Sequence, residues 1–143
     1  MSKLYQARRG HYCGPTAVAA ITGLPVEQVS VLVNRLRKRP DGQQVYGTYW
    51  HELIRILRDL GYTVNTIRLP AKPKGHKVLR VLDLEERLGW SSVHLIETKT
   101  HFLAMRDGLV VDSATPQGKL LRDHPNRRMH ATCVAIVYAP RAR

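Results

Sequence analysis

The chain has 143 residues and a mass of 16.3 kDa, the size of a single domain that can bury an ordinary hydrophobic core. Hydrophobic residues make up 43% of it, which argues against wholesale disorder, and two cysteines are too few for a disulfide framework or a four-thiolate zinc site. The net charge of +12 predicts an acidic partner, which could be nucleic acid, an anionic membrane surface or an acidic protein.

The amino-terminal residues lack the apolar stretch of a signal peptide. No apolar run approaches the ~20 residues that span a bilayer. We therefore expect one cytoplasmic domain over residues 1–143, without a membrane span.

The first half of the chain carries helix signals. After Cys13, a run of small residues begins with Pro15, which suits a first helical turn, and ends at Gly23, which suits a helix stop. A second helix is predicted over Val26–Arg39 and a third over Thr48–Leu60, where apolar residues recur at helical spacing.

The second half changes to the alternating pattern of strands. The predicted strands are Tyr62–Leu69, Ser92–Glu97, His101–Arg106, Leu109–Ser113 and Thr132–Tyr138. A short helix is predicted within Val78–Leu88, and loops over Pro70–Lys77 and Ala114–His130. Helices followed by strands predict an α+β domain, with N-terminal helices packed on a C-terminal antiparallel sheet.

Cys13 stands just before the first predicted helix. The backbone N–H groups and the dipole at a helix N-terminus favour the thiolate and lower the pKa of a thiol there. The alternative is a small buried core residue, the more common fate of a lone cysteine. Cys13 lies outside any apolar stripe, and Gly14 leaves its approach unobstructed, so the sequence favours a nucleophile.

A thiolate nucleophile needs a base, and the base needs an orienting group. The pair Asp107-Gly108 between alternating apolar residues predicts a two-residue hairpin turn. In the register set by this turn, Ala104 lies opposite Val111. His101 and Asp112 then become diagonal neighbours on one face of the hairpin. A three-residue loop would instead place them on opposite faces, and an aspartate that ends a strand often only caps a turn.

Two segments resemble parts of a known family. The residues Tyr12–Thr16, before a helix of small residues, are similar to the nucleophile segment of papain-fold cysteine peptidases. The hairpin from His101 to Asp112 resembles the histidine strand and following aspartate of the same group. The chain looks most like the compact bacteriocin-processing (double-glycine leader) peptidases and their relatives in bacteria and phages, over essentially its whole length.

The resemblance implies a papain-like fold and a hydrolase that cleaves a peptide or isopeptide bond. Cys13 would be the nucleophile, His101 the general base and then the general acid, and Asp112 the group that orients the imidazole. The family's glutamine that binds the oxyanion would correspond to Gln6, the only glutamine upstream of Cys13. Acyl or amide transfer on the same triad stays open beside hydrolysis, and small size and basicity agree with a phage-encoded protein.

The expected partner is a protein or peptide substrate, which the basic surface would select for acidity. The alternative function is a basic binding protein for nucleic acid or for a host or virion protein, with the thiol incidental or the site inactive. The excess charge lies largely in Arg35–Arg39, Lys72–Lys77 and Arg122–Arg143.

No metal or other cofactor is expected. His124 and His130 share a loop with Asp123, but neither paired cysteines nor helical histidine spacing supports a metal site there. Cys133 lies in the last predicted strand and is interpreted as a packing residue.

Overall fold

The computed structural model describes residues 4–5, 12–69, 80–84 and 92–140. The helices are α1 (Cys13–Thr22), α2 (Val26–Leu36), α3 (Trp50–Asp59) and the single turn α4 (Val81–Leu84). The strands are β1 (Thr63–Arg68), β2 (Val93–Thr98), β3 (Phe102–Arg106), β4 (Leu109–Val111), β5 (Lys119–Leu120) and β6 (Ala131–Tyr138), and a 3-10 turn covers Leu121–Asp123. The described part of the chain therefore has the predicted α+β composition, with most helices before the sheet.

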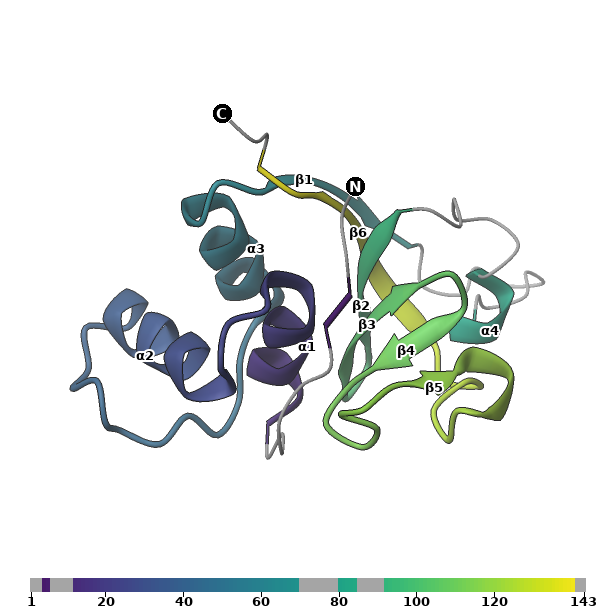
Figure 1. Cartoon of the computed structure of the whole chain (residues 1–143), viewed down its shortest axis with the longest axis horizontal. Coiled ribbons are helices and arrows are strands. Elements are labelled where there is room, and N and C mark those ends of the chain that lie inside the picture. Colours follow the sequence, from purple (N-terminus) through teal and green to yellow (C-terminus); the bar gives the residue numbers. More distant parts are fainter. Residues whose placement is uncertain (1–3, 6–11, 70–79, 85–91, 141–143) are drawn as a thin grey trace.

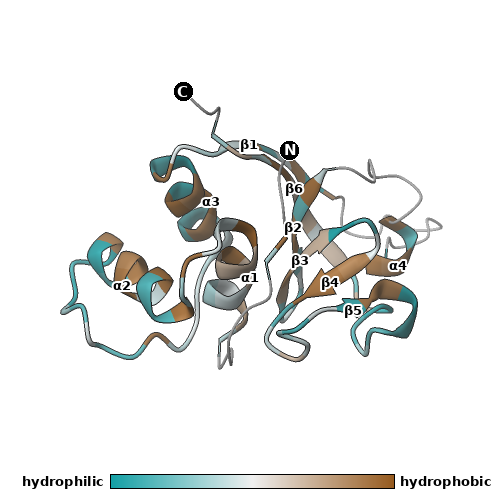
Figure 2. Cartoon of the chain, in the orientation of Figure 1, coloured by the Kyte–Doolittle hydropathy of each residue, from teal (hydrophilic) through white to brown (hydrophobic). Residues whose placement is uncertain are grey.

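The strands form one antiparallel sheet in the order β1-β6-β2-β3-β4-β5. Helices α1, α2 and α3 lie on one side of this sheet, and α4 lies on the other (Figure 1). Alternate residues of β3 serve two cores: Ala104 packs with the helices, whereas Leu103 and Met105 pack with α4 and the 3-10 turn. Figure 2 shows that α3 is hydrophobic on one side and hydrophilic on the other.

Helix α1 is the most deeply placed helix. Its residues from Gly14 to Ile21 are buried, because small side chains such as Ala17 and Ala20 let the helix approach β3 closely. The Tyr12 carbonyl accepts hydrogen bonds from the N–H and, at 2.6 Å, from the hydroxyl of Thr16. The helix ends at Gly23, whose φ of 78° is the left-handed conformation that glycine adopts readily.

Helix α2 ends at Leu36, so the prediction of a helix to Arg39 was wrong by three residues. Lys38 adopts a left-handed φ of 58°. Its N–H donates to the Arg35 carbonyl, and the Arg39 N–H donates to the Asn34 carbonyl, which is the Schellman arrangement. Glycine normally occupies this position, so a lysine there gave no signal in the sequence.

The chain between β4 and β6, predicted as the loop Ala114–His130, contains β5 and the 3-10 turn. Strand β5 pairs with β4, with Leu120 opposite Leu109. A strand of two residues is too short to leave an alternating pattern. The predicted loop Pro70–Lys77 lies outside the described residues, and α4 is the described part of the helix predicted within Val78–Leu88.

The hairpin of β3 and β4 has the predicted register. Ala104 lies opposite Val111, and Arg106 lies opposite Leu109. Asp107 and Gly108 have φ values of 52° and 73°, and two positive values are the signature of the two-residue type I′ turn. This confirmed register places His101 just before β3 and Asp112 just after β4.

Within the described residues, no single helix is long and apolar enough to cross a membrane. Helices α1 and α2, which meet at a bend of 114°, satisfy the length and composition criteria only as a pair.

A shielded ion pair links α2 to α3. Arg37 makes two hydrogen bonds of 2.7 Å to the carboxylate of Glu52, and these side chains are only 17% and 7% exposed. Arg37 also donates to the Gly47 carbonyl, and Glu52 accepts a hydrogen bond from the Tyr49 N–H. The hydrogen bonds from Arg37 lower the pKa of Glu52. The pair thereby fixes the α2–α3 connection, which packs on the first turn of α1.

Replacing Glu52 with Gln leaves the Arg37 charge shielded and unpaired, so we expect a loss of about 3 kcal/mol in the free energy of unfolding. Asp59→Asn is the matched control, because it breaks the Arg55–Asp59 pair, whose side chains are 67% and 61% exposed. That change is expected to cost less than about 0.5 kcal/mol. Denaturant titration measures both, and equal losses would contradict the structural role given to Arg37–Glu52.

Candidate active site

Cys13 is the first residue of α1, and it is partly exposed. Burial acts to raise the pKa of its thiol, but a hydrogen bond from the His101 ring and backbone N–H groups of Phe102 and Gly14 outweigh burial. The pKa of Cys13 therefore lies below its ordinary value. The helix N-terminus acts in the same direction, since its N–H groups and dipole favour an anion.

The residue after Cys13 has no room for a side chain. A Cβ added to Gly14 would lie 1.9 Å from the hydroxyl oxygen of Thr48 and 3.1 Å from its Cβ. The α2–α3 connection thus rests directly on the first turn of α1. Glycine permits this contact beside the nucleophile, a role that the sequence did not indicate.

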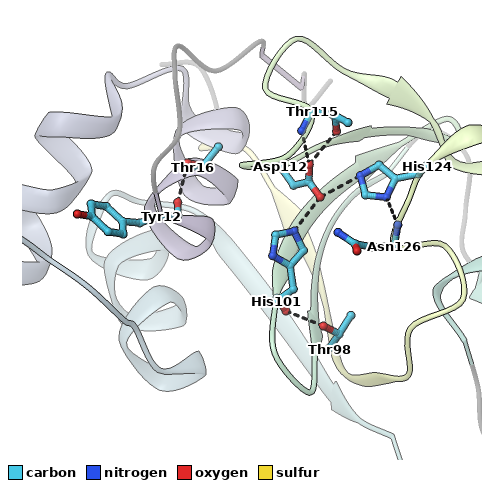
Figure 3. A network of polar contacts seen from close by, with 8 residues as sticks. All are labelled: Tyr12, Thr16, Thr98, His101, Asp112, Thr115, His124 and Asn126. Carbon is cyan, nitrogen blue, oxygen red and sulfur yellow. Dashed lines mark hydrogen bonds and ion pairs between the residues drawn. The ribbon is translucent and has the colours of Figure 1, made fainter.

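His101 follows the tight turn that joins β2 to β3. Its carbonyl accepts hydrogen bonds from the N–H of Thr98 at 2.8 Å and from the Thr98 hydroxyl at 3.2 Å, so its backbone is fixed. Its ring Nε2 lies 2.8 Å from Oδ2 of Asp112 (Figure 3). Burial acts to lower the pKa of His101, but hydrogen bonds with Asp112 and Cys13 raise the pKa to about 9.

Asp112 is completely buried. Its Oδ1 accepts hydrogen bonds of 2.7 Å from both the N–H and the hydroxyl of Thr115, while Oδ2 faces His101 and His124. Burial acts to raise the pKa of this carboxyl, but hydrogen bonds from His101, His124 and Thr115 outweigh it and keep the pKa well below its usual range. Asp112 is therefore an anion that can orient and stabilise an imidazolium.

His124 is the residue at this site that the sequence interpretation missed. It is completely buried, and its Nε2 lies 2.9 Å from Oδ2 of Asp112. The sequence places His124 in one loop with His130, where we expect no metal site, so His124 had no predicted role. No group of three or more metal-binding side chains is arranged to hold an ion in the part of the chain described here. The available signal was weak: a histidine in the loop that follows the candidate aspartate.

The structure thus brings together three of the four predicted site residues, Cys13, His101 and Asp112. The fourth, Gln6, lies outside the described residues. Cys133 is a free thiol buried in β6, and burial raises its pKa.

The opposite pKa shifts of Cys13 and His101 favour a thiolate beside an imidazolium at neutral pH. Such a pair combines a nucleophile with an adjacent proton donor. It can attack an electrophilic carbon and then protonate the group that leaves.

In comparisons with known proteins, no family model matches this chain, and no curated protein is significantly similar to it. The geometry of the site is therefore the basis of the functional argument.

The pH dependence of Cys13 alkylation tests the ion pair, with Cys133→Ala as the background so that one thiol reacts. We expect the rate to reach half its maximum below pH 8.5, since a lowered pKa preserves the thiolate at lower pH than an ordinary thiol of pKa about 8.5. In His101→Ala the midpoint should move to higher pH, because the hydrogen bond that lowers the pKa of Cys13 is lost while the burial that raises it remains. In the chain that retains His101, a midpoint at or above about pH 8.5 would contradict the ion pair of Cys13 and His101.

Proposed function

We propose that this protein is a cysteine peptidase-like hydrolase that cleaves a peptide or isopeptide bond. The observation that carries the proposal is the position of the His101 imidazole, which contacts the Cys13 thiol and also lies 2.8 Å from the Asp112 carboxylate. The imidazole can thus exchange a proton with sulfur or substrate while the carboxylate fixes its orientation.

In the first proposed step, the Cys13 sulfur attacks the carbonyl carbon, and a C–S bond forms as the carbonyl electrons move onto oxygen. His101 then donates its proton to the leaving nitrogen, and the C–N bond breaks to give a thioester. In the second step, His101 removes a proton from water, which attacks the thioester and releases the acid. The C–S bond breaks, so that the thiolate and the imidazolium are restored.

An oxyanion develops in both steps and needs hydrogen-bond donors. We propose the Cys13 backbone N–H at the start of α1 as one donor. The Gln6 side chain is proposed as the second, on the resemblance of its segment to the peptidase family.

A papain-like fold is part of the same proposal. A buried helix supplies the nucleophile from its N-terminus, and a packed antiparallel sheet supplies the histidine and the acid. This division supports the resemblance in the YCGPT segment and the histidine hairpin. An acidic protein or peptide is the proposed substrate class, since the chain carries a net charge of +12.

A peptide probe with a thiol-reactive electrophile tests the nucleophile. We expect the probe to label Cys13, as located by mass spectrometry of the digested adduct, and Cys133→Ala to leave the labelling rate unchanged. His101→Ala should reduce that rate by about 100-fold or more, the usual contribution of an acid–base group. Cleavage of a peptide library should depend on the same residues. Equal labelling rates with and without His101 would count decisively against a Cys–His mechanism.

A basic binding protein is the second candidate. The net charge favours it, and Lys38, Arg39, Arg122 and Arg128 are exposed. In this case the thiol is incidental to binding.

Fluorescence anisotropy with labelled single- and double-stranded nucleic acid tests the second candidate at two salt concentrations. If it is correct, affinity falls steeply with salt because phosphate contacts release counterions, and Cys13→Ala binds as tightly as the unaltered chain. Absence of binding at low salt would remove nucleic acid as the partner.

A further inference from the structure

Two imidazole rings face the same oxygen of Asp112. Nε2 of His101 lies 2.8 Å from Oδ2, and Nε2 of His124 lies 2.9 Å from it. Figure 3 shows the two rings approaching the carboxylate from different sides, with Thr115 at the other oxygen. The proposed triad therefore has a fourth side chain behind it, and that side chain does not contact Cys13 in the hydrogen-bond pattern described here.

The proton on His124 can be assigned from its other ring nitrogen. The backbone N–H of Asn126 donates to Nδ1 of His124 at 3.0 Å, so Nδ1 is an acceptor and carries no proton. The ring proton is then on Nε2, the atom that faces Asp112. His124 thus offers the carboxylate a neutral N–H, and the negative charge of Asp112 stays available to the His101 imidazolium.

His124 is attached to the hairpin that carries His101 and Asp112. It follows the 3-10 turn, where its N–H donates to the Leu121 carbonyl. Leu121 is completely buried in the second core, and its own N–H donates to the Gly108 carbonyl of the hairpin turn at 2.7 Å. The His124 carbonyl also accepts a hydrogen bond of 3.0 Å from the Arg127 side chain. These contacts fix the ring behind Asp112.

We propose that His124 is a positioning residue of this site, whose Nε2, 2.9 Å from Oδ2 of Asp112, holds that carboxylate directed at His101. The proposal rests on the proposed function, because it assigns His124 a role in the same thiol chemistry. His124 acts through Asp112 and His101, and neither substrate nor Cys13 is its partner.

The direction of its effect follows from the groups in contact. His101 and His124 are the titratable side chains that contact Asp112, at 2.8 Å and 2.9 Å, and His101 in turn contacts Cys13. Loss of the His124 ring removes one of the two groups that hold Oδ2, so the carboxylate is free to turn away from His101, and a misdirected carboxylate stabilises the imidazolium less. When the imidazolium of His101 is less stable, it is less available to stabilise the Cys13 thiolate, so the thiolate forms only at higher pH.

Two polar substitutions test the roles of the two ring nitrogens of His124 separately. In His124→Gln, the longer side chain brings an amide N–H to the position of Nε2, so a donor to Asp112 is restored. In His124→Asn, the shorter side chain reaches only the position of Nδ1 and loses that donor. The matched control is His94→Asn, because His94 is an equally buried histidine in β2 that makes none of the hydrogen bonds described for Asp112.

The readout is the pH midpoint of Cys13 alkylation in the Cys133→Ala background, with thermal unfolding measured in parallel. We expect His124→Asn to raise the midpoint by about one pH unit and slow alkylation about tenfold below it, the effect of one hydrogen bond to a charged group. His124→Gln should recover most of the rate, and His94→Asn should leave the midpoint unchanged even where it lowers the unfolding temperature. An unchanged midpoint in His124→Asn, or equal shifts in all three variants, would overturn the role of His124.

A second measurement needs no substitution. Nitrogen-15 NMR of the histidine side chains in the unaltered chain should show the His124 proton on Nε2, and a proton on Nδ1 would overturn the proposal. These outcomes differ from failure of the proposed function. If the proposed function fails, the pH midpoint of Cys13 alkylation is that of an ordinary thiol already in the chain that retains His124.

Discussion

An ionised carboxylate that is removed from water costs several kcal/mol unless hydrogen-bond donors replace the water. Asp112 is completely buried, and the structure provides donors to both of its oxygens from three places along the chain: His101, Thr115 and His124. This requirement accounts for the course of the chain after β4. Thr115 turns back onto the carboxylate, β5 returns beside β4, and the 3-10 turn places His124 behind it.

The nucleophile faces the same cost on the other side of His101. Burial disfavours the Cys13 thiolate, and donors from His101, Phe102 and Gly14 reverse that effect. The imidazole lies between the Cys13 sulfur and the buried Asp112 carboxylate, and its hydrogen bonds with both raise its pKa to about 9 despite its own burial. The site is therefore a chain of three side chains in which the neighbours of each favour its charged form.

The parts of the fold that could be predicted are those fixed by local stereochemistry. The Asp107-Gly108 turn has one favourable geometry for joining two strands, so the register, and with it the proximity of His101 and Asp112, followed from the sequence. The end of α1 at Gly23 followed in the same way from its glycine, and Pro15 lies in the first turn as predicted, although the helix already begins at Cys13.

The contribution of His124 depends on tertiary contacts and could not be predicted in this way. Its position depends on a strand of two residues and on Leu121, whose backbone bonds to the hairpin turn while its side chain fills the second core. The early end of α2 was missed for a related reason, because Lys38 adopts a conformation that its residue type disfavours. The packing of Thr48 on Gly14 likewise joins positions that are distant in the sequence.

The sulfur belongs to the helical layer, whereas the imidazole and the carboxylate belong to one hairpin of the sheet. A local opening that moved α1 away from β3 would leave His101 bound to Asp112 but deprive Cys13 of its proton acceptor. The thiol would return to ordinary behaviour and lie mostly protonated at neutral pH. A chain in which α1 separates from β3 would thus lose the reactivity of Cys13. This reactivity is therefore confined to the state in which the helical layer packs on the sheet.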